Sequence, residues 1–245
     1  MFDPATATLE RLLAEAADDA TRRHWEAYLK GTARFRGVPM AGVRSAVRRT
    51  WREHALVEAS TNDLLTLAHR WFAAPTSEDK LAAVLLLAEQ VPDRLGVEHL
   101  GALAAPFGAG HIADWNVCDW YATKTLHVFL TYDPDDTEPR ARGLARWGRA
   151  ESLWQRRAGL VAFVKLAPRA AEQFEGFTEL VLQLCRDNLV SDDRFAHTGP
   201  GWVLRELSRS EPDAVRRFVE ENDRLSDEAR RMALARLRRG RYRRR

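Results

Sequence analysis

The sequence lacks the features of membrane-spanning, secreted or metal-binding proteins. No apolar run approaches the roughly 20 residues of a transmembrane helix. The chain begins with the acidic stretch MFDPATATLERLLAEAADD, whereas a signal peptide begins with basic and then apolar residues. Cys118 and Cys185 are far apart and the histidines are scattered, so we expect two buried thiols and no disulfide or zinc site. We therefore expect a cytoplasmic protein without a metal or other cofactor.

Lysine is scarce too, and the arginines that replace it are concentrated at one end. The last 16 residues, RRMALARLRRGRYRRR, contain 9 arginines and no acid, so the net charge of +3 leaves −6 for the first 229 residues. Basic tails often contact phosphate groups. They are also common as solvated chain ends, and the sequence leaves both interpretations open.

Strand patterns are nearly absent, and about a dozen short segments follow helical periodicity. Turn signals such as YDPDD, APR and SEP separate them. Paired short helices are typical of HEAT and armadillo repeats, so we predict an all-α fold, a curved superhelical array of stacked HEAT-like repeats or α-solenoid. We expect a single domain over residues 1–240 and a basic C-terminal tail over 241–245. An irregular all-α bundle is the alternative, because the repeats resemble one another only weakly.

The sequence predicts four helices that bear on the candidate functional segments. One helix begins at Ser77, with Glu78 and Asp79 in its first turn, where acids suit the helix dipole. A second ends at Pro106 and the glycines that follow it, and a third runs from Trp115 to about Tyr132. A fourth covers residues 201–210, and Gly199-Pro200-Gly201 before it would let a ligand backbone come close.

The segment HIADWNVCDWYATKTL, residues 111–126, contains an indole and a carboxylate four residues apart. On a helix, Trp115 and Asp119 share one face, and Ala122 and Leu126 would continue it. One interpretation is that Trp115 belongs to the core and Asp119 is an acid favoured by the helix dipole. The other is that the pair forms part of a functional site.

Two further segments place arginine beside tryptophan. In LWQRRAGLVAFV, Arg157 has the same helical spacing as Leu153, Leu160 and Val164, whereas Arg156 falls on a more polar side. An arginine on an apolar stripe needs a partner or a phosphate, unless it snorkels from the stripe edge to solvent.

In GPGWVLRELSRS the core face is Val203, Leu204 and Leu207, and Trp202 and Arg205 point outward with Glu206 and Arg209. An outward indole can stack on a sugar or base while the arginine holds a phosphate. The alternative is that a neighbouring repeat covers Trp202.

These residues resemble the AlkD-like family of bacterial HEAT-like-repeat alkylpurine DNA glycosylases, over most of the chain from GVPMAGVRSAVRRTW to PDAVRRFVEEN. WNVCD matches the family's Trp-x-x-x-Asp element, WQRRA its helix of the form W-x-x-R-small, and GWVLRELSRSEP its G-W-x-L-R-E element. The intervening Asn-Val-Cys, the following Trp120-Tyr121 and a longer connection to Trp202 depart from the pattern. These departures bear on substrate range more than on chemistry.

The resemblance implies a role for each matched residue. Asp119 would be the catalytic carboxylate, with Trp115 and Trp202 packed on the deoxyribose and backbone, and Arg157 and Arg205 on phosphates. Arg156 is a further candidate for DNA contact. No metal is implied. The resemblance also implies that the protein grips the DNA backbone and need not enclose the base, which would admit bulky cationic adducts.

We therefore predict a monofunctional DNA glycosylase that removes cationic N3- or N7-alkylated purines from double-stranded DNA, acting as a nucleoid-associated monomer in base excision repair. Self-resistance against a DNA-alkylating natural product is a conceivable role, and no residue pattern selects it. Two different functions also stay open, a non-catalytic DNA-binding or lesion-recognition protein and a protein-interaction scaffold. Retention of Asp119 beside Trp115 counts against a simple DNA binder, because a carboxylate near phosphates opposes binding.

Overall fold

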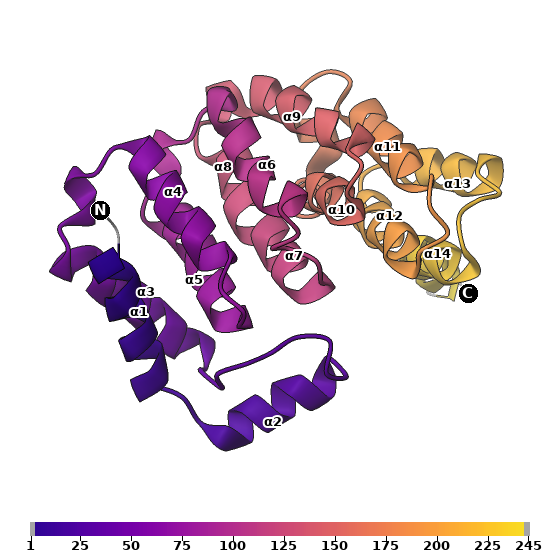
Figure 1. The fold of residues 1–245 in the computed structure, drawn as a ribbon. Coiled ribbons are helices and arrows are strands. Elements are labelled where there is room, and N and C mark those ends of the chain that lie inside the picture. The colour runs from indigo at the N-terminus through magenta and orange to yellow at the C-terminus, as the bar shows by residue number, and fades with distance from the viewer. Residues whose placement is uncertain (1–2, 243–245) are drawn as a thin grey trace. The chain divides into compact units, whose positions relative to one another are not determined.

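The protein is all-α, as predicted. A computed structural model describes residues 3–242, with side chains through residue 237, and in this part of the chain there is no β-strand. None of its helices is long and apolar enough to cross a membrane. Figure 1 shows the helices as a ribbon coloured along the chain. The chain divides between Thr125 and Leu126 into two compact units.

Unit 1 is a set of helical layers built around one apolar helix. Its α-helices are α1 (Asp3–Glu15), α2 (Asp19–Tyr28), α3 (Met40–Glu53), α4 (Thr61–Phe72), α5 (Ser77–Glu89), α6 (Leu100–Gly108) and α7 (Trp115–Tyr121). Helix α5 is apolar around its circumference and buried from Leu81 to Ala88, as expected for a central helix. It contacts α1, α3, α4 and α7. This packing holds α7, the helix of Trp115 and Asp119, against the core of the unit.

Helix α6 runs through Pro106 and ends at Gly108, the first of the glycines at which its end was predicted. A proline inside a helix leaves the carbonyl group four residues earlier without its usual donor. Here that carbonyl group belongs to Ala102, and its oxygen lies 2.7 Å from Nε2 of His69, which donates to it. A side chain from α4 thus replaces the missing backbone bond, and the helix can continue.

The helix predicted over residues 115–132 is interrupted by a π-helical turn. Helix α7 ends at Tyr121, the π-turn covers Ala122–Leu126, and α8 (His127–Thr131) follows. In unit 1, Thr125 of this turn donates from Oγ1 to the carbonyl oxygen of Val84, 3.0 Å away. Short π-turns occur frequently at functional sites. This one directly follows the candidate catalytic helix.

Unit 2 is organised around α12. Its α-helices are α8, α9 (Thr137–Ala145), α10 (Leu153–Val161), α11 (Phe177–Asn188), α12 (Arg194–Leu207), α13 (Pro212–Glu221) and α14 (Asp227–Tyr242). Helix α12 packs on α10, α11 and α14. It begins at Arg194, seven residues before the predicted start at Gly201, because Asp193 caps it by accepting from the backbone N–H of Phe195 at 2.7 Å.

The glycines of α12 serve helix packing rather than ligand approach. Gly199 and Gly201 are buried inside the helix. A Cβ atom on Gly201 would come within 2.9 Å of Cα of Ala229 in α14, so glycine is needed there for the two helices to approach this closely.

Both cysteines are buried free thiols, as predicted. Burial raises the pKa of Cys185, so its thiol stays protonated. The backbone of the predicted basic tail is described only for residues 241–242, which end α14; residues 243–245 and the tail side chains lie outside the described part of the chain. Contact of this tail with nucleic acid stays a prediction.

Candidate functional site

One face of α7 is anchored in the core of unit 1, which fixes the direction of the opposite face. Asp114 caps the helix by accepting from the backbone N–H of Val117 at 2.9 Å. Tyr121 is fully buried, and its hydroxyl group donates to the carbonyl oxygen of Leu103 at 2.9 Å. Ahead of the helix, Nζ of Lys80 donates to the carbonyl oxygen of His111 at 2.6 Å. These bonds leave α7 little freedom to rotate.

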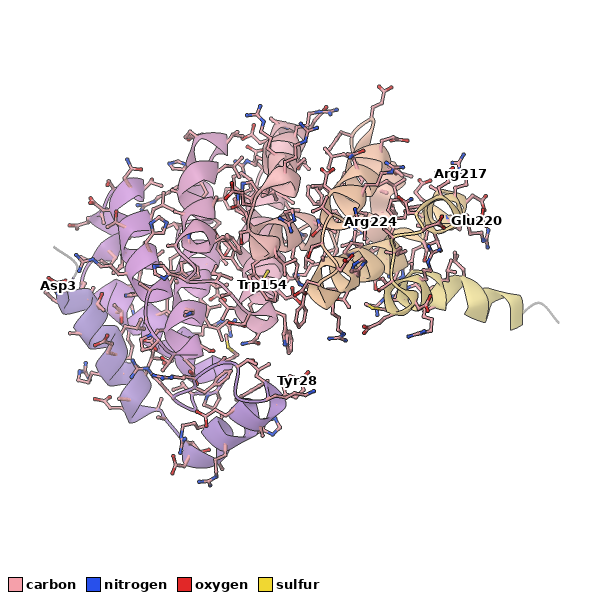
Figure 2. All side chains as sticks on the ribbon, turned by 45° about the vertical axis from the view of Figure 1, so that its right-hand side comes forward. Asp3, Tyr28, Trp154, Arg217, Glu220 and Arg224 are labelled. Carbon is pink, nitrogen blue, oxygen red and sulfur yellow. The ribbon has the colours of Figure 1, made fainter. Side chains whose placement is uncertain are left out.

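Trp115 and Asp119 lie on the partly exposed face of α7. The interpretation that Trp115 belongs to the core is therefore wrong. Its ring meets the exposed ring of Tyr28 edge to face, with centroids 5.9 Å apart, and Tyr28 stands at the end of α2 (Figure 2). Ala122 and Leu126, which were predicted to continue this face, are fully buried and are the first and last residues of the π-turn.

The backbone of Asp119 is fixed by the π-turn. Its carbonyl oxygen accepts from the backbone N–H of Ala122 and, at 2.6 Å, from Oγ1 of Thr123. An acid held at a half-buried position beside an indole is suited to stabilise positive charge on a bound group. Nowhere in the described part of the chain are three histidine, cysteine or acidic side chains grouped as metal ligands would be.

The two arginines of α10 are both buried, with 7% of Arg156 and 5% of Arg157 exposed. Nη1 of Arg157 donates to α12, at 2.9 Å to the carbonyl oxygen of Phe195 and at 3.1 Å to Oγ1 of Thr198. The snorkelling interpretation of Arg157 is therefore wrong. The side chain reaches inward, where its charge is matched by hydrogen-bond acceptors.

Arg156 differs from the prediction as well, because it does not lie on a polar side. Its Nη1 donates to the carbonyl oxygens of Ala150 and Glu151, at 2.6 and 2.7 Å. These carbonyl groups precede α10, and the guanidinium group holds them against the first turn of that helix. Burial lowers the pKa of Arg156, since removal from water disfavours the charged form.

An aromatic pair adjoins Arg157 in unit 2. The rings of Trp154 and Phe195 lie 5.2 Å apart, and Trp154 is labelled in Figure 2. The guanidinium group of Arg157 lies 5.8 Å from the centroid of Phe195, within the range of a cation–π contact. Arg157 therefore joins α10 to α12 through both hydrogen bonds and ring contact.

The outward face of α12 agrees with the sequence prediction. Val203, Leu204 and Leu207 are fully buried, whereas Trp202 and Arg205 are partly exposed. Nε of Arg205 donates to Oε1 of Glu206 at 2.9 Å.

Glu206 is bound by two arginines, since Arg236 of α14 also reaches it at 2.8 Å. Burial acts to raise the pKa of Glu206, but the hydrogen bonds from Arg236 and Arg205 outweigh burial and lower it. The carboxylate therefore stays charged and partly neutralises Arg205.

The predicted site residues fall into two groups. Unit 1 brings together Trp115 and Asp119 on one face of α7. In unit 2, Arg157 bonds to the first turns of α12 at Phe195 and Thr198, whereas Trp202 and Arg205 lie on the partly exposed face of the same helix. Helical spacing correctly predicted the shared face of Trp115 and Asp119 and the outward face of Trp202 and Arg205, but not the burial of Arg156.

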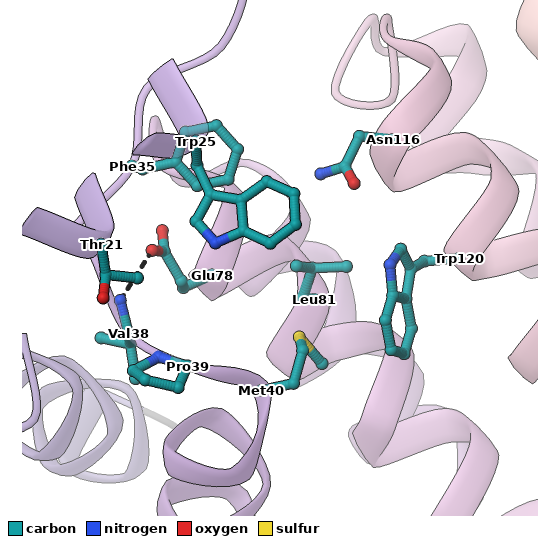
Figure 3. Close-up of a pocket in the computed structure, with 10 residues that line it drawn as sticks. All are labelled: Thr21, Trp25, Phe35, Val38, Pro39, Met40, Glu78, Leu81, Asn116 and Trp120. Atoms are coloured by element: carbon teal, nitrogen blue, oxygen red, sulfur yellow. Dashed lines mark hydrogen bonds between the residues drawn. The ribbon is translucent and has the colours of Figure 1, made fainter. Parts of the chain in front are cut away.

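Sequence reasoning missed a pocket inside unit 1 (Figure 3). It has a volume of about 390 Å³ and is lined mostly by apolar and aromatic side chains: Thr21, Trp25, Phe35, Val38, Pro39, Met40, Glu78, Leu81, Asn116 and Trp120. Two of these, Asn116 and Trp120, come from α7. Trp120, which departs from the family pattern, was the signal available in the sequence.

The wall of the pocket opposite α7 is fixed by the first turn of α5. Glu78, 2% exposed, accepts from the backbone N–H groups of Arg36, Gly37 and Val38 at 2.8–3.0 Å. Asp79 binds the guanidinium group of Arg36 through two hydrogen bonds, which raise the pKa of Arg36. The two acids that suit the helix dipole thus also hold a connecting loop in place.

Comparison with known proteins agrees with these observations. A family model described as DNA alkylation repair enzyme matches residues 9–237. No curated protein matches the chain significantly in sequence. A solved structure described as a predicted DNA alkylation repair enzyme from Enterococcus faecalis is similar in fold, with a TM-score of 0.72 and 20% sequence identity, covering 89% of this chain and 95% of that one.

Proposed function

Because the chain belongs to the DNA alkylation repair enzyme family, we propose that it is a monofunctional glycosylase for cationic N3- or N7-alkylated purines in double-stranded DNA. One observation carries the proposal. The carboxylate of Asp119 and the indole of Trp115 share the partly exposed face of α7, whose other face is fixed in the core.

The proposed chemistry follows from charge. Alkylation at N3 or N7 places a positive charge on the purine and weakens its glycosidic bond. As that bond breaks, positive charge develops on the deoxyribose as an oxocarbenium ion. The charge of Asp119 stabilises this ion more than the ground state, which is the condition for catalysis. The same carboxylate orients the water that attacks the sugar.

We assign roles to the two tryptophans and the three arginines according to how exposed each side chain is. The half-buried indoles of Trp115 and Trp202 pack on the deoxyribose and backbone beside the lesion, where their faces stabilise positive charge. Arg205 contacts a phosphate. For Arg156 and Arg157 a phosphate contact stays a prediction. Their burial and their bonds to the protein support a second role, in which they position the helices that carry the site.

The experiment is release of free base from duplex DNA that contains N7- or N3-alkylated purines. We expect release by the wild type and a loss of at least about 100-fold in Asp119→Asn, the size of effect seen when one group that stabilises a transition state is removed. Duplex binding should be retained or strengthened, because one negative charge near phosphates is lost.

Asp93→Asn is the matched control, because Asp93 is an exposed acid in the same unit and its replacement causes the same change in charge. It should release base at the wild-type rate. Wild-type activity in Asp119→Asn would refute the catalytic role. Duplex binding without release of small or bulky alkylated bases would favour a lesion-recognition protein instead.

A further inference from the structure

Lys80 joins the central helix of unit 1 to the helix that carries Trp115 and Asp119. It is the fourth residue of α5 and is half-buried. Its Nζ atom donates to the carbonyl oxygen of His111, 2.6 Å away. This distance is short for a hydrogen bond from nitrogen, as is usual where the donor is charged. The backbone that Lys80 holds belongs to residues 109–114, the connection between α6 and α7.

The connection between α6 and α7 is attached to two different helices. The backbone N–H groups of His111 and Ile112 both donate to the carbonyl oxygen of Pro106, at 2.8 and 3.3 Å, and these bonds attach it to α6. The bond from Lys80 attaches it to α5. Only three residues lie between His111 and Trp115, the first residue of α7, so the bond from Lys80 acts close to the start of the helix.

A second hydrogen bond attaches the other end of this segment to α5. Thr125 of the π-turn donates to the carbonyl oxygen of Val84 at 3.0 Å, and between the two ends Val117 of α7 is fully buried. Apolar packing has no preferred direction, whereas a hydrogen bond has one. The two bonds therefore fix the position of α7 along α5, and loss of the bond from Lys80 would free the end at which Trp115 lies.

The surroundings of Lys80 determine when it is charged. Burial lowers the pKa of Lys80, and the carboxylate of Asp114, the N-cap of α7, raises it by less. Glu78 and Asp79, in the same turn of α5, are instead bound by residues 36–38. Within the residues that the structure describes, no other charged side chain shifts the pKa of Lys80. Lys80 therefore loses its proton at a lower pH than an ordinary lysine, whose pKa is about 10.4.

We propose that Lys80 is a positioning residue of the candidate site: through the connection before α7, its charged amino group sets the direction of Trp115 and Asp119. The inference rests on the proposed function, because Asp119 is catalytic only in that case. A neutral amine binds a carbonyl group more weakly than an ammonium group does. Loss of the proton therefore loosens the start of α7, and base release should slow at alkaline pH.

Cys118 reports on the position of α7 without any assay of activity. It is fully buried on α7, and Cys185 is fully buried in unit 2, so a reagent reaches either thiol only when its helix opens. The probe is iodoacetamide, and mass spectrometry measures the labelling rate of each cysteine. We expect Lys80→Met to be labelled severalfold faster than the wild type at Cys118 and equally fast at Cys185, because methionine keeps the apolar stem and removes the donor and the charge.

Lys30→Met is the matched control, because Lys30 is an exposed lysine of the same unit and its replacement causes the same chemical change. It should be labelled as the wild type is. Thermal unfolding separates a local effect from a loss of folding, and we expect Lys80→Met to unfold at nearly the wild-type temperature. If its melting temperature falls sharply, the pH dependence of the wild type and of Lys80→Arg still decides the question.

The pH dependence tests the charge of Lys80 in the unmodified protein. The chain has only four lysines, Lys30, Lys80, Lys124 and Lys165, so NMR of protein that contains isotope-labelled lysine can follow each one, and Lys80→Arg identifies the signal of Lys80. We expect Lys80 to lose its proton below the ordinary lysine value of about 10.4. Asp114→Asn should lower that pH further, since asparagine still caps a helix but lacks the charge.

Base release from alkylated duplex DNA in a single turnover connects this charge to the site. The wild-type rate should fall as the pH rises through the titration of Lys80, whereas Lys80→Arg, which stays charged, should not show this fall. At neutral pH, Lys80→Met should release base at least about tenfold more slowly, since a small misplacement of a catalytic group has an effect of this size or larger. Its affinity for the duplex should stay close to that of the wild type.

Two kinds of failure can be told apart. Wild-type labelling of Cys118 and wild-type base release in Lys80→Met, or equal pH profiles for the wild type and Lys80→Arg, would overturn the positioning role and leave the glycosylase function intact. Slower release without faster labelling would also overturn it, because Lys80 would then act without moving α7. If the wild type releases no base from any alkylated duplex, the glycosylase function is refuted, and the labelling of Cys118 still decides whether Lys80 positions α7.

Discussion

Arg157 and Arg205 carry the same guanidinium group, and the sequence predicts a phosphate contact for both, but the structure gives them opposite surroundings. Arg157 is 5% exposed and donates from α10 to the backbone and a side chain of α12. The side chain of Arg205 is 36% exposed and pairs with Glu206 on the outer face of α12. Arg157 thus contacts α12 from its inner side, whereas Arg205 lies on its outer face.

This difference in burial determines how much each arginine can contribute to stability and to DNA binding. A buried guanidinium group that satisfies carbonyl and hydroxyl acceptors contributes to stability through every bond that it makes. Arg205 is the more exposed partner of its ion pair, since the side chain of Glu206 is 12% exposed, and water and salt screen an exposed guanidinium group. Arg205 can exchange Glu206 for a phosphate because Arg236 still pairs with Glu206. The Nη1 atom of Arg157 is bonded to α12. Only the rest of its guanidinium group could contact DNA.

The strongest way to break this comparison is Arg157→Ala. The substitution removes a buried side chain and leaves the carbonyl group of Phe195 and the hydroxyl group of Thr198 without this donor. We expect a loss of about 3 kcal/mol in the free energy of unfolding, from the cavity and the unsatisfied acceptors together. Urea denaturation of wild type and variant measures it.

The salt dependence of duplex binding by the same variant tests the predicted phosphate contact of Arg157. If the residue acts only inside the protein, the slope of log affinity against log salt will match that of the wild type. A slope reduced by about one would establish a phosphate contact in addition. A loss of stability below about 1 kcal/mol would contradict the positioning role.

The second substitution, Gly201→Ala, affects the inner face of α12 alone. Its Cβ atom would lie 2.9 Å from Cα of Ala229, and backbone atoms cannot move aside as a flexible side chain can. We expect a loss of about 2 kcal/mol from overpacking, seen as a lower melting temperature.

Gly199→Ala is the matched control for Gly201→Ala, since its nearest contact is 3.4 Å to the flexible Nη1 end of Arg157. Replacing glycine by alanine inside a helix otherwise stabilises a protein. Gly199→Ala should therefore cost less than about 1 kcal/mol. Equal melting temperatures for the two variants would contradict the close approach of α12 and α14.

The helices and the two groups of site residues could be predicted from the sequence because helical periodicity is local information. It placed Trp115 beside Asp119, and it placed Trp202 and Arg205 on the outer face of α12. The same pattern put Arg157 on an apolar stripe, where the structure has it.

The features that the sequence could not predict depend on contacts between segments far apart. The carbonyl group of Ala102, which Pro106 leaves without a backbone donor, is paired because His69 reaches it from α4. Arg156 is buried only because the carbonyl groups before α10 fold back onto it. The pocket forms where α2, α3, α5 and α7 meet, and no local pattern in any one of them reveals it.

Arg205→Ala sharpens the comparison from the exposed side. We expect weaker duplex binding at every sequence and a slope of log affinity against log salt reduced by about one. The free energy of unfolding should change by less than about 1 kcal/mol. Fluorescence anisotropy at several salt concentrations measures the binding, with Arg217→Ala as the control for loss of one exposed charge in the same unit (Figure 2).

A larger loss of stability in Arg205→Ala than in Arg157→Ala would reverse the comparison. A salt slope equal to that of the wild type would reject the phosphate contact of Arg205.

The smallest expected effect concerns Glu206, which links Arg205 to Arg236. Because the pKa of Glu206 is lowered in the folded protein, its charge stabilises the fold above the unfolded pKa, about 4.3 for glutamate. This stabilisation is lost as the pH falls through the lower, folded pKa. At pH 7, Glu206→Gln should therefore be less stable than the wild type by under about 1 kcal/mol, and the difference should shrink at pH 3.

The matched control for Glu206→Gln is Glu220→Gln, because Glu220 is exposed on α13 of the same unit (Figure 2). Its substitution should not alter the dependence of stability on pH. Glu206→Gln should also bind duplex DNA slightly more tightly, since Arg205 no longer has to leave a carboxylate to reach a phosphate. Urea denaturation at the two pH values and anisotropy at pH 7 measure both effects. A stability difference that is the same at pH 7 and pH 3 would show that Glu206 acts through packing rather than charge, and that its carboxylate does not restrain Arg205.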